Sequence, residues 1–493
     1  MIFTQLPALE VVVPLVAAPL CLLVRDGRVA WGLALAASWG VLVIAILLLT
    51  LVLDNGIISY DFGGWGAPYG IEYRVDLVSA FVMLIVTGIN SVVLFFARVS
   101  VANEIDLGRQ SLFYTTWLLC LTGLLGIVMT GDVFNLFVFL EISSLSSYVL
   151  IGLGQDRRAL TAAYQYLVMG TIGATFILIG VGLLYTMTGT LNMADLAHQL
   201  PAVIESRTVR TALAFLVVGT SLKLALFPLH LWLPNAYAFA PSAVTAFLAA
   251  TVTKVAVYVL LRFLFTIFGV RFAFEVMPLG IVLAALGAIA ILSTSVVAVF
   301  QDNIKRMLAY SSVAQIGYMV LGISMASVTG LTATMLHLFN HALMKGSLFL
   351  ALGCVVYRLG SVRLGDLAGA GHRIPWTMAA FVLGGLSLIG IPLTAGFLSK
   401  WYLVLAALER GWWPVLLVVV IGSLLAIVYV WRVVEMAYLR RPTHPDPSSM
   451  HEAPLSLLVP TWVLVGANLY FGIHTSLSVG VAGKAAVLLI GGS

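Results

Sequence analysis

Five ionisable side chains, one glutamate and four lysines, stand inside long apolar stretches of the sequence. Glu141 lies nine residues into one such run (VFNLFVFLEISSLSSY), or about 13 Å deep at 1.5 Å per residue. Inserting a carboxylate there costs roughly 2.5 kcal/mol or more, so we expect it to be protonated, paired or in contact with water. The lysines are Lys223, Lys254, Lys345 and Lys400. A buried lysine beside a carboxylate forms a proton site that a third charge can switch, which is the chemistry of a proton relay.

Two histidines extend this set. His337, His341 and Lys345 follow one another at intervals of four residues, so they share one face of a helix, and imidazole titrates near physiological pH. The two histidines could instead bind a metal or haem. Haem between helices normally needs a histidine on a facing helix, and His230 lies near the end of an apolar run, so we favour the relay and predict no metal.

Other interpretations of the ionisable residues are structural. Glu141 could serve only as a hydrogen-bonding residue, and Lys400 is close enough to the end of its run for its ammonium group to reach the membrane surface. Glu10, in the first apolar run, has no evident partner, and we interpret it as peripheral. Arg432 and Glu435 are three residues apart and are predicted to pair locally.

The elements that position these residues must be membrane spans. Of the 493 residues, 61% are hydrophobic and 9% are charged, whereas soluble domains carry about 25% charged residues. The apolar runs reach the roughly 20 residues that a spanning helix needs and lack the alternation of barrel strands, which predicts an all-α polytopic membrane protein. About fourteen spans are expected, near 5–24, 29–53, 76–98, 111–130, 132–153, 159–187, 208–227, 241–265, 274–299, 304–324, 329–357, 375–403, 412–439 and 455–475.

Composition also bears on cofactors and partners. Cys21, Cys120 and Cys354 are scattered without metal-ligand spacing, which argues against iron–sulfur clusters, c-type haem and disulfides, so we predict no cofactor. The net charge of +5 is better explained by loop charges than by nucleic-acid binding. The beginning of the chain lacks the basic and small-residue signals of a cleaved leader, so we expect a retained first span.

Loop charges predict the orientation in the membrane. Thirteen lysines and arginines lie in the odd-numbered loops, against seven in the even-numbered loops and the end of the chain. Those seven are Arg74, Arg207, Arg210, Arg262, Arg271, Arg410 and Lys484. By the positive-inside bias, the odd loops face the cytoplasm of a plasma (inner) membrane and both termini lie outside.

An internal repeat divides the chain. Asp132, Tyr148 and Gly152 recur at an offset of 170 as Asp302, Tyr318 and Gly322, and further matches follow at 171. The matched spans are five apart, so the two copies must cross the membrane in opposite directions, as in transporters with a site near the bilayer midplane. We expect helices 1–3 in residues 1–110, the two five-helix repeats in 111–266 and 267–441, and helix 14 with a C-terminal tail in 442–493.

Two spans are predicted to be broken. The seventh runs into Pro228 and Pro234 around His230 (KLALFPLHLWLPNAY), and the twelfth is interrupted at Pro392. Proline there leaves backbone carbonyls without intrahelical partners, which calls for water or polar side chains. The prolines could merely bend the helices for packing, but their matching places in the two repeats favour functional breaks.

These residues and spacings resemble the antiporter-like subunits shared by Mrp-type cation/proton antiporters, respiratory complex I and membrane-bound hydrogenases. The resemblance covers essentially the whole chain. It rests on GDVFNLFVFLEISSLSSYVLIGLG, SLKLALFPLHLWLPNAYAFAPSAVTAFLAATVTKVAVY, DNIKRMLAYSSVAQIGYMVLGI, HLFNHALMKGSLFLALG and GIPLTAGFLSKW. It implies fourteen helices with two inverted five-helix repeats, in agreement with the repeat found here.

The resemblance also implies a role for each buried residue. Glu141 corresponds to the fifth-helix glutamate and Lys223 to the lysine that pairs with it, while Lys254 corresponds to the central eighth-helix lysine. The histidines resemble the relay between the halves, Lys345 belongs to the HAxxKxxLF pattern, and Lys400 resembles the terminal residue on the twelfth helix, which is a glutamate in one complex I paralogue.

The short end of the chain and the GGWGAPYGIEYRVD segment resemble most the D subunits of Mrp antiporters. The implied function is that of a proton-translocating subunit that works with other membrane subunits and exchanges protons for Na⁺ or K⁺. A proton-pumping subunit of complex I, as part of an NADH:quinone oxidoreductase, or of a membrane-bound hydrogenase is the alternative. A lipid-linked transferase would need acidic or metal-binding loops, which are scarce here, and a passive scaffold would tolerate loss of the buried charges.

Overall fold

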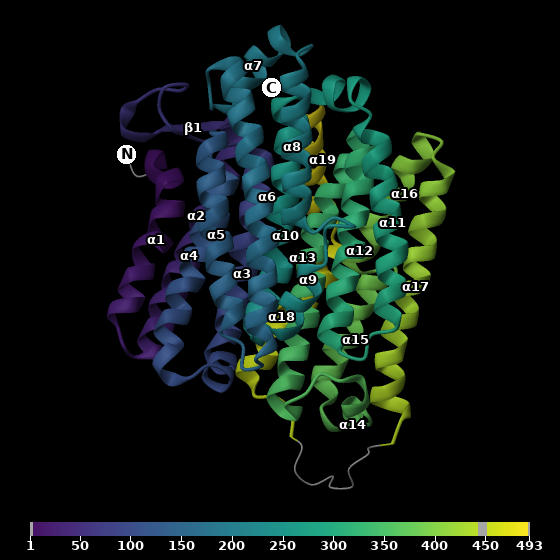
Figure 1. Cartoon of the computed structure of the whole chain (residues 1–493). Helices are drawn as coiled ribbons and strands as arrows, with labels where there is room; N and C mark the ends of the chain where they lie inside the picture. Colours follow the sequence, from purple (N-terminus) through teal and green to yellow (C-terminus); the bar gives the residue numbers. More distant parts are fainter. Residues whose placement is uncertain (1–2, 442–450, 492–493) are drawn as a thin grey trace.

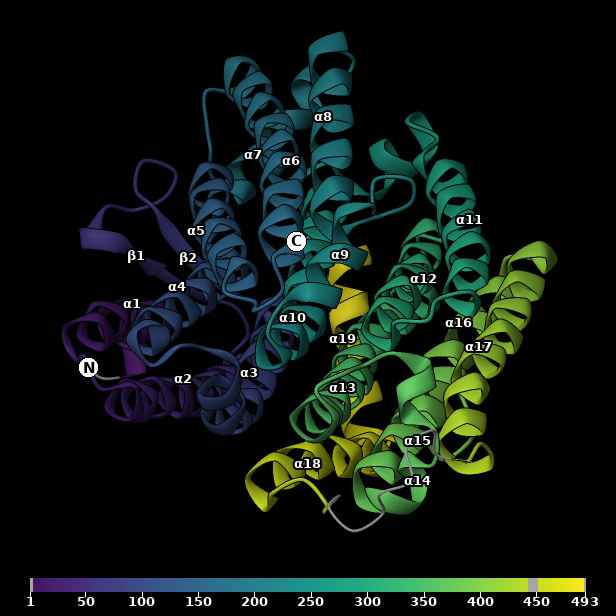
Figure 2. The ribbon, with the colours of Figure 1, turned by 60° about the horizontal axis from the view of Figure 1, so that its bottom comes forward.

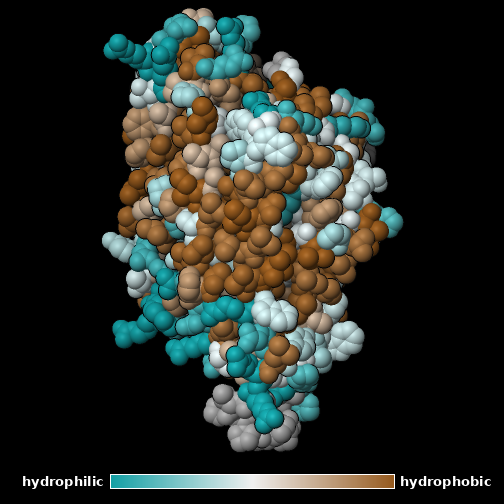
Figure 3. Space-filling view, turned by 90° about the vertical axis from the view of Figure 1, so that its right-hand side faces the viewer, coloured by the Kyte–Doolittle hydropathy of each residue, from teal (hydrophilic) through white to brown (hydrophobic). Residues whose placement is uncertain are grey.

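The computed structural model describes residues 3–441 and 451–491, most of which are helical (Figure 1). Within these ranges, twelve helices are long and apolar enough to cross a membrane. They are α1 (Leu6–Leu23), α2 (Gly27–Asn55), α3 (Leu77–Glu104), α4 (Gln110–Met129), α5 (Val133–Gly152), α6 (Arg158–Thr188), α10 (Ser242–Leu261), α11 (Leu279–Val299), α12 (Ile304–Ser324), α13 (Val328–Leu359), α17 (Trp413–Leu439) and α18 (Leu455–Ile473). Figure 3 shows a hydrophobic band between two hydrophilic ends, as a lipid-facing surface requires. The predicted polytopic all-α class is confirmed.

Two further spans are each divided between two shorter helices. α8 (Arg207–Leu224) and α9 (Trp232–Phe239) occupy the place of the predicted seventh span. α15 (Pro375–Ile389) and α16 (Ala395–Glu409) occupy the place of the twelfth. Twelve unbroken and two broken spans make fourteen in the described part of the chain, so the predicted number and both predicted breaks are confirmed.

The backbone repeats the pattern found in the sequence. Isolated bridges join Asp132 to Asn192 and Asn303 to Arg363, and the second bridge lies 171 positions after the first at both of its residues. α6 and α13, which end shortly before the second residue of each bridge, are both followed by a glycine in the left-handed region. Because the matched spans are five apart, they cross in opposite directions, and the repeat is inverted as predicted.

The buried helices form a central group that is surrounded by lipid-facing helices (Figure 2). In the membrane-crossing parts of α10 and α12, 94% of residues are buried, against 33% in α2 and α17. Small residues allow close approach in the interior: a Cβ atom at Gly123 of α4 would lie 2.5 Å from the backbone nitrogen of Ser143 on α5. The central helices are therefore the ones that can shelter polar side chains from lipid.

Shorter elements cover the two ends of the bundle. An antiparallel hairpin of β1 (Ile58–Asp61) and β2 (Glu72–Val75) and the helix α7 (Met193–Val203) lie at the upper end in Figure 1. Two π-helical turns, Arg262–Ile267 and Arg271–Val276, follow α10, and α14 (Ala370–Arg373) precedes α15. Short 3₁₀ turns occupy Phe3–Gln5, Phe62–Gly64, Leu107–Arg109 and Leu364–Leu367.

The segment interpreted as a C-terminal tail contains a helix, α19 (Ser476–Gly491). It buries Ala482, Ala485 and Ala486 and packs against α3 and α13. The sequence did not reveal this helix because its apolar run is shorter than a bilayer-spanning helix requires.

Candidate functional site

Glu141 and Lys223 form an ion pair inside the membrane-spanning bundle. Lys223, near the end of α8, donates from Nζ to Oε1 of Glu141 on α5 at 3.2 Å and to Oγ of Ser144 at 2.8 Å. The Lys223 side chain is 6% exposed and that of Glu141 is 25% exposed. A cavity of about 20 Å³, large enough for about one water, is lined by Lys223, Ser144 and Thr220. The structure thus joins the two residues that the sequence analysis paired.

The break between α8 and α9 lies directly beside this pair. Lys223 stands in the last turn of α8, and Ala225, just beyond that helix, has a left-handed backbone with φ of 60°. The carbonyl of Leu222, in the last turn of α8, accepts hydrogen bonds from the backbone N–H of Ala225 at 3.3 Å and from Nε1 of Trp232 at 3.0 Å. The break therefore fixes the backbone that carries Lys223 without leaving this carbonyl unpaired.

The three predicted break residues of the first repeat differ in their places. Pro228 and His230 lie in the connection between the two helices, and His230 is buried with no hydrogen-bond partner for Nδ1. Pro234 lies in the first turn of α9, where the missing backbone N–H interrupts no helical bond. The break thus precedes Pro234.

Lys254 occupies the centre of the bundle on α10 and is completely buried. Its ammonium group donates to the carbonyl of Ala249 and lies 3.5 Å from Oγ1 of Thr253. No carboxylate of residues 3–441 or 451–491 forms an ion pair with it. Because buried charges are normally paired, the protonation state of Lys254 must depend strongly on its surroundings.

The α13 residues share one buried face, as predicted. Ring nitrogens of His337 lie 2.8 Å from Oγ of Ser399 on α16 and 3.0 Å from Oε1 of Gln315 on α12. The rings of His337 and His341 are stacked with centroids 5.9 Å apart, and neither ring nitrogen of His341 has a partner. His337 thus connects three helices of the second repeat.

The other cation of α13, Lys345, is fully buried. It donates to the carbonyl of Leu308 at 2.8 Å and to the hydroxyl of Ser311, both on α12. Its partners are therefore neutral groups of the neighbouring helix.

Lys400 marks the second break. Its Nζ donates to the carbonyls of Leu388 at 3.1 Å and Ile389 at 2.9 Å, which end α15, and to Oγ of Ser423 at 3.0 Å. The residue is 6% exposed, so its ammonium group does not reach the membrane surface. The predicted break residue Pro392 lies in the connection between α15 and α16. Lys400 thus satisfies the carbonyls that the interruption frees.

The helices that carry these residues are α5, α8, α10, α13 and α16, and Figure 2 shows α5 and α16 on opposite sides of the molecule. α8 packs against α10, α10 against α13, and α13 against α16. Within the described residues, direct hydrogen bonds join Glu141 to Lys223 but do not link Lys223, Lys254 and His341 to one another. Proton exchange between those positions requires water or side-chain movement.

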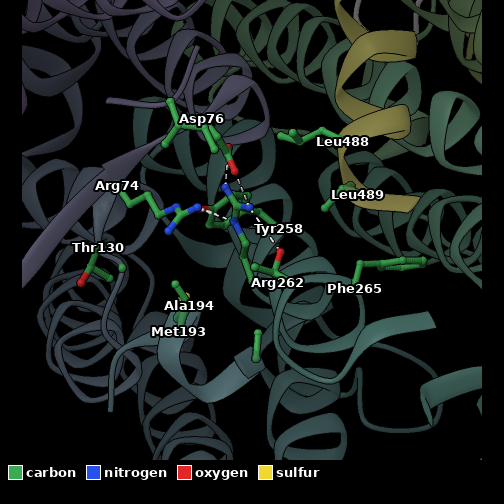
Figure 4. A pocket seen from close by; sticks show the side chains of 14 residues that line it. Arg74, Asp76, Thr130, Met193, Ala194, Tyr258, Arg262, Phe265, Leu488 and Leu489 are labelled. Carbon is green, nitrogen blue, oxygen red and sulfur yellow. Dashed lines mark hydrogen bonds and ion pairs between the residues drawn. The ribbon is translucent and has the colours of Figure 1, made fainter. Parts of the chain in front are cut away.

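The structure corrects the sequence interpretation of Arg262, which was counted among the loop charges. Arg262 is buried and donates to both carboxylate oxygens of Asp76, at 2.6 and 2.7 Å (Figure 4). Its Nε donates to the hydroxyl of Tyr258 at 2.8 Å. Burial alone would raise the pKa of Asp76, but the charge and hydrogen bonds of Arg262, with those of Ser79, hold it below its ordinary value.

This ion pair borders a cavity of about 60 Å³ at the same end as the hairpin, into which Arg74 also points (Figure 4). A signal for its carboxylate was available in the sequence: Asp76 precedes an apolar run and forms a capping box with Ser79. No sequence pattern connects it with Arg262, 186 positions away.

Two further sequence interpretations were wrong. Glu10 was taken as peripheral, but it is completely buried on α1 and neither carboxylate oxygen has a hydrogen-bond partner. Arg432 and Glu435 do not pair with each other. Glu435 instead pairs with Arg440 at 2.8 Å, and Arg432 lies 3.7 Å from the carboxylate of Asp302. Each residue therefore has a partner other than the one three positions away on α17.

Comparisons with known proteins agree with this architecture. The family model described as NADH:quinone oxidoreductase/Mrp antiporter, TM, matches residues 130–426. NADH-quinone oxidoreductase subunit N of Desulforudis audaxviator is 45% identical over 474 residues, which cover 93% of this chain and 94% of that protein. The D subunit of the Na(+)/H(+) antiporter of Alkalihalophilus pseudofirmus is 30% identical over 433 residues, with 88% and 86% covered.

Among solved structures, a chain of the Mrp complex from Dietzia sp. has a TM-score of 0.90 and 27% identity, with 99% of this chain and 98% of that chain covered. The family match extends over more than half of the chain and includes both breaks and the helices that carry the buried lysines. The chain belongs to the NADH:quinone oxidoreductase/Mrp antiporter transmembrane family, as an antiporter-like subunit.

Proposed function

We propose that the chain translocates protons through the membrane as one subunit of a larger complex. The observation that carries the proposal is the Glu141–Lys223 ion pair, held 3.2 Å apart between two membrane-spanning helices and beside a helix break. Ion pairs in hydrocarbon are rare and mark ion pathways by default. The path continues through Lys254, then through His337, His341 and Lys345, and ends at Lys400.

The pair can act as a switch. A proton that reaches Glu141 neutralises the carboxylate and leaves Lys223 without its counter-charge. The uncompensated ammonium group then tends to release its proton toward a neighbouring acceptor, because an unpaired buried charge is costly. Ser144 keeps one hydrogen bond to Lys223 while its proton is exchanged, which holds the side chain in place.

The two breaks supply access to the path. Glu141 is the more exposed member of its pair, at 25%, and its partner Lys223 stands in the last turn before the break of α8 and α9. Protons can therefore enter beside this break. The break of α15 and α16, where Lys400 lies, provides the exit or entry on the other side. The matching halves, 111–266 and 267–441, each contribute one half-channel, with 1–110 and 442–493 packed around them.

Transport against a membrane potential requires a coupled reaction, since moving one charge against 100 mV takes about 2.3 kcal/mol. Exchange for Na⁺ or another monovalent cation is the first candidate. It is favoured by the likeness across the whole chain to a chain of the Mrp complex and to the D subunit of an Na(+)/H(+) antiporter. Such coupling needs partner membrane subunits.

We place the odd-numbered loops in the cytoplasm and both termini outside a plasma membrane.

A redox-driven pump is the second candidate. It is favoured by the relative with 45% identity, whose name is NADH-quinone oxidoreductase subunit N. The proposed proton path is the same in both cases, and only the source of free energy differs.

The proposal is tested in everted vesicles from antiporter-deficient cells that express this subunit with its partners. An acid interior is established, NaCl is added, and a pH-sensitive dye is followed. Glu141→Gln should abolish the sodium-dependent alkalinisation, whereas Glu10→Gln, a matched change at a buried glutamate outside the path, should leave it within about twofold. Equal transport by wild type and Glu141→Gln would contradict the proposal.

The same vesicles distinguish the two couplings. Acidification driven by an electron donor, with no response to sodium, would assign the chain to a redox pump. A passive scaffold predicts a third result, since Glu141→Leu combined with Lys223→Leu would then leave transport unchanged.

A further inference from the structure

A wide cleft opens at the end of the bundle that is remote from the hairpin, beside the turn between α1 and α2 (Figure 1, lower left). Its volume is about 590 Å³, in the range of sites for small ligands. The turn, α3 and the beginning of α4 form its walls. The polar side chains that line it include Arg25, Arg28, Arg98, Gln110 and Tyr114.

The cleft carries an excess of positive charge. None of Arg25, Arg28 and Arg98 forms an ion pair with a carboxylate of the described residues. Asp26 is the one acid among the lining residues, and its carboxylate accepts from the backbone nitrogen of Arg28 at 2.7 Å as the cap of α2. Three arginines and one aspartate leave a charge of +2 around the cleft. An anion is the ligand that this charge favours.

Packing fixes the walls before any ligand arrives. Nε1 of Trp31 donates to the carbonyl of Leu94 at 3.0 Å, which holds the indole ring between α2 and α3. The guanidinium carbon of Arg98 lies 4.8 Å from the centroid of that ring. A Cβ atom at Gly27 would lie 2.3 Å from Oε1 of Gln110, so the turn approaches α4 as closely as only glycine allows.

Apolar, lipid-facing surface adjoins the cleft. Phe95 lies one turn before Arg98 on α3, is 42% exposed, and contacts Trp31 with ring centroids 6.4 Å apart. Val29 of α2 is 50% exposed. A soluble anion would use only the arginines, whereas an amphiphile would use both the charged cleft and the apolar surface.

We infer that the cleft binds the phosphate group of an anionic phospholipid, with its acyl chains along Trp31 and Phe95. Arg28 and Arg98 contact the phosphate from α2 and α3, and Arg25 adds a third positive charge from the turn. Basic pockets between membrane helices on the cytoplasmic side are suited to such head groups. The predicted orientation places this end in the cytoplasmic leaflet, where arginine-rich loops collect.

The test is native mass spectrometry of the purified full chain, titrated with dioleoylphosphatidylglycerol or dioleoylphosphatidylcholine. Arg28→Gln combined with Arg98→Gln should weaken phosphatidylglycerol binding about 30-fold, since each arginine near an anionic lipid contributes about 1 kcal/mol. The control combines Arg157→Gln with Arg441→Gln, two exposed arginines that do not line the cleft, and should bind as wild type does. Phosphatidylcholine should bind weakly to all three proteins.

Three results would overturn the inference. Equal weakening by the test and control variants would show that the total charge, and not the cleft, attracts the lipid. Complete displacement of the lipid by inorganic phosphate would assign the cleft to a free anion. The third result concerns the complex purified with its partners. If Arg28→Gln with Arg98→Gln loses neighbouring subunits there but binds lipid as wild type does, the cleft binds an acidic segment of a partner.

Discussion

The ammonium group of Lys345 donates a hydrogen bond to Ser311, which stands 170 positions after Glu141 and takes its place in the second repeat. In the first repeat, a carboxylate and a serine hydroxyl accept from Lys223. In the second, a serine hydroxyl and the carbonyl of Leu308 accept from Lys345. In each half a buried lysine therefore donates to one of the matched helices, α5 or α12, but only the first half supplies a counter-charge.

This difference predicts the effect of adding a carboxylate to the second half. Ser311→Asp should lower proton transport at least tenfold, because an ion pair with Lys345 would hold a proton that the path must pass on. Transport is measured with a pH-sensitive dye in vesicles, and assembly is checked by the recovery of the partner subunits. Ser311→Ala, which keeps the carbonyl of Leu308 as an acceptor, should remain within about twofold of wild type. Transport by assembled Ser311→Asp at the wild-type rate would contradict a role for Lys345 in proton transfer.

Lys400 is predicted to contribute to stability as well as to transport. Lys400→Leu leaves the carbonyls of Leu388 and Ile389 without this donor, and each buried unsatisfied group costs about 1–3 kcal/mol. Thermal unfolding of the purified chain should therefore shift to lower temperature. Ser423→Ala removes only one of the acceptors of Lys400 and should shift the transition much less. Unchanged unfolding of Lys400→Leu would mean that water replaces the ammonium group at the break.

The Asp76–Arg262 pair is predicted to be a strong link between α3 and the end of α10. Asp76→Asn removes the charge that compensates Arg262 and should destabilise the protein by about 3–5 kcal/mol, as for other broken buried pairs. Asp76→Leu combined with Arg262→Met should be less harmful, because it leaves no buried charge unpaired. Denaturation of the variants in detergent measures the difference. A double variant no more stable than Asp76→Asn would show that shape, and not charge, dominates this contact.

The same pair predicts a dependence of stability on pH. The pKa of Asp76 is lower in the folded protein than its ordinary value, about 3.9. The stabilisation is therefore fully present above that value and is lost as the pH falls through the lower, folded-state value. Unfolding of wild type should become easier in strong acid, and Asp76→Asn should lack this part of the dependence.

Span number and breaks could be predicted because each leaves a local trace in the sequence, and the need of Glu141 for a partner follows in the same way. Apolar length marks a span, proline marks a break, and an acid within an apolar run needs a partner. The choice of Lys223 as that partner came from the family resemblance.

The facing partner of Asp76 left no such trace, since Arg262 is 186 positions away. The acceptors of Lys345 left none because they are a backbone carbonyl and a serine hydroxyl, which no sequence pattern marks as partners. The error at Glu10 has a similar cause: burial depends on how α2 and α4 close around α1, which periodicity does not report.

The central claim is that protons cross from one half of the subunit to the other through Lys254, the fully buried lysine of α10. The most direct test is proton flux in proteoliposomes that contain the purified complex, with Lys254→Met compared with wild type. The proposed path predicts that Lys254→Met keeps the same subunit content but loses at least tenfold in flux, because methionine fills the space and carries no proton. Flux within twofold of wild type from the assembled variant would show that protons take another route.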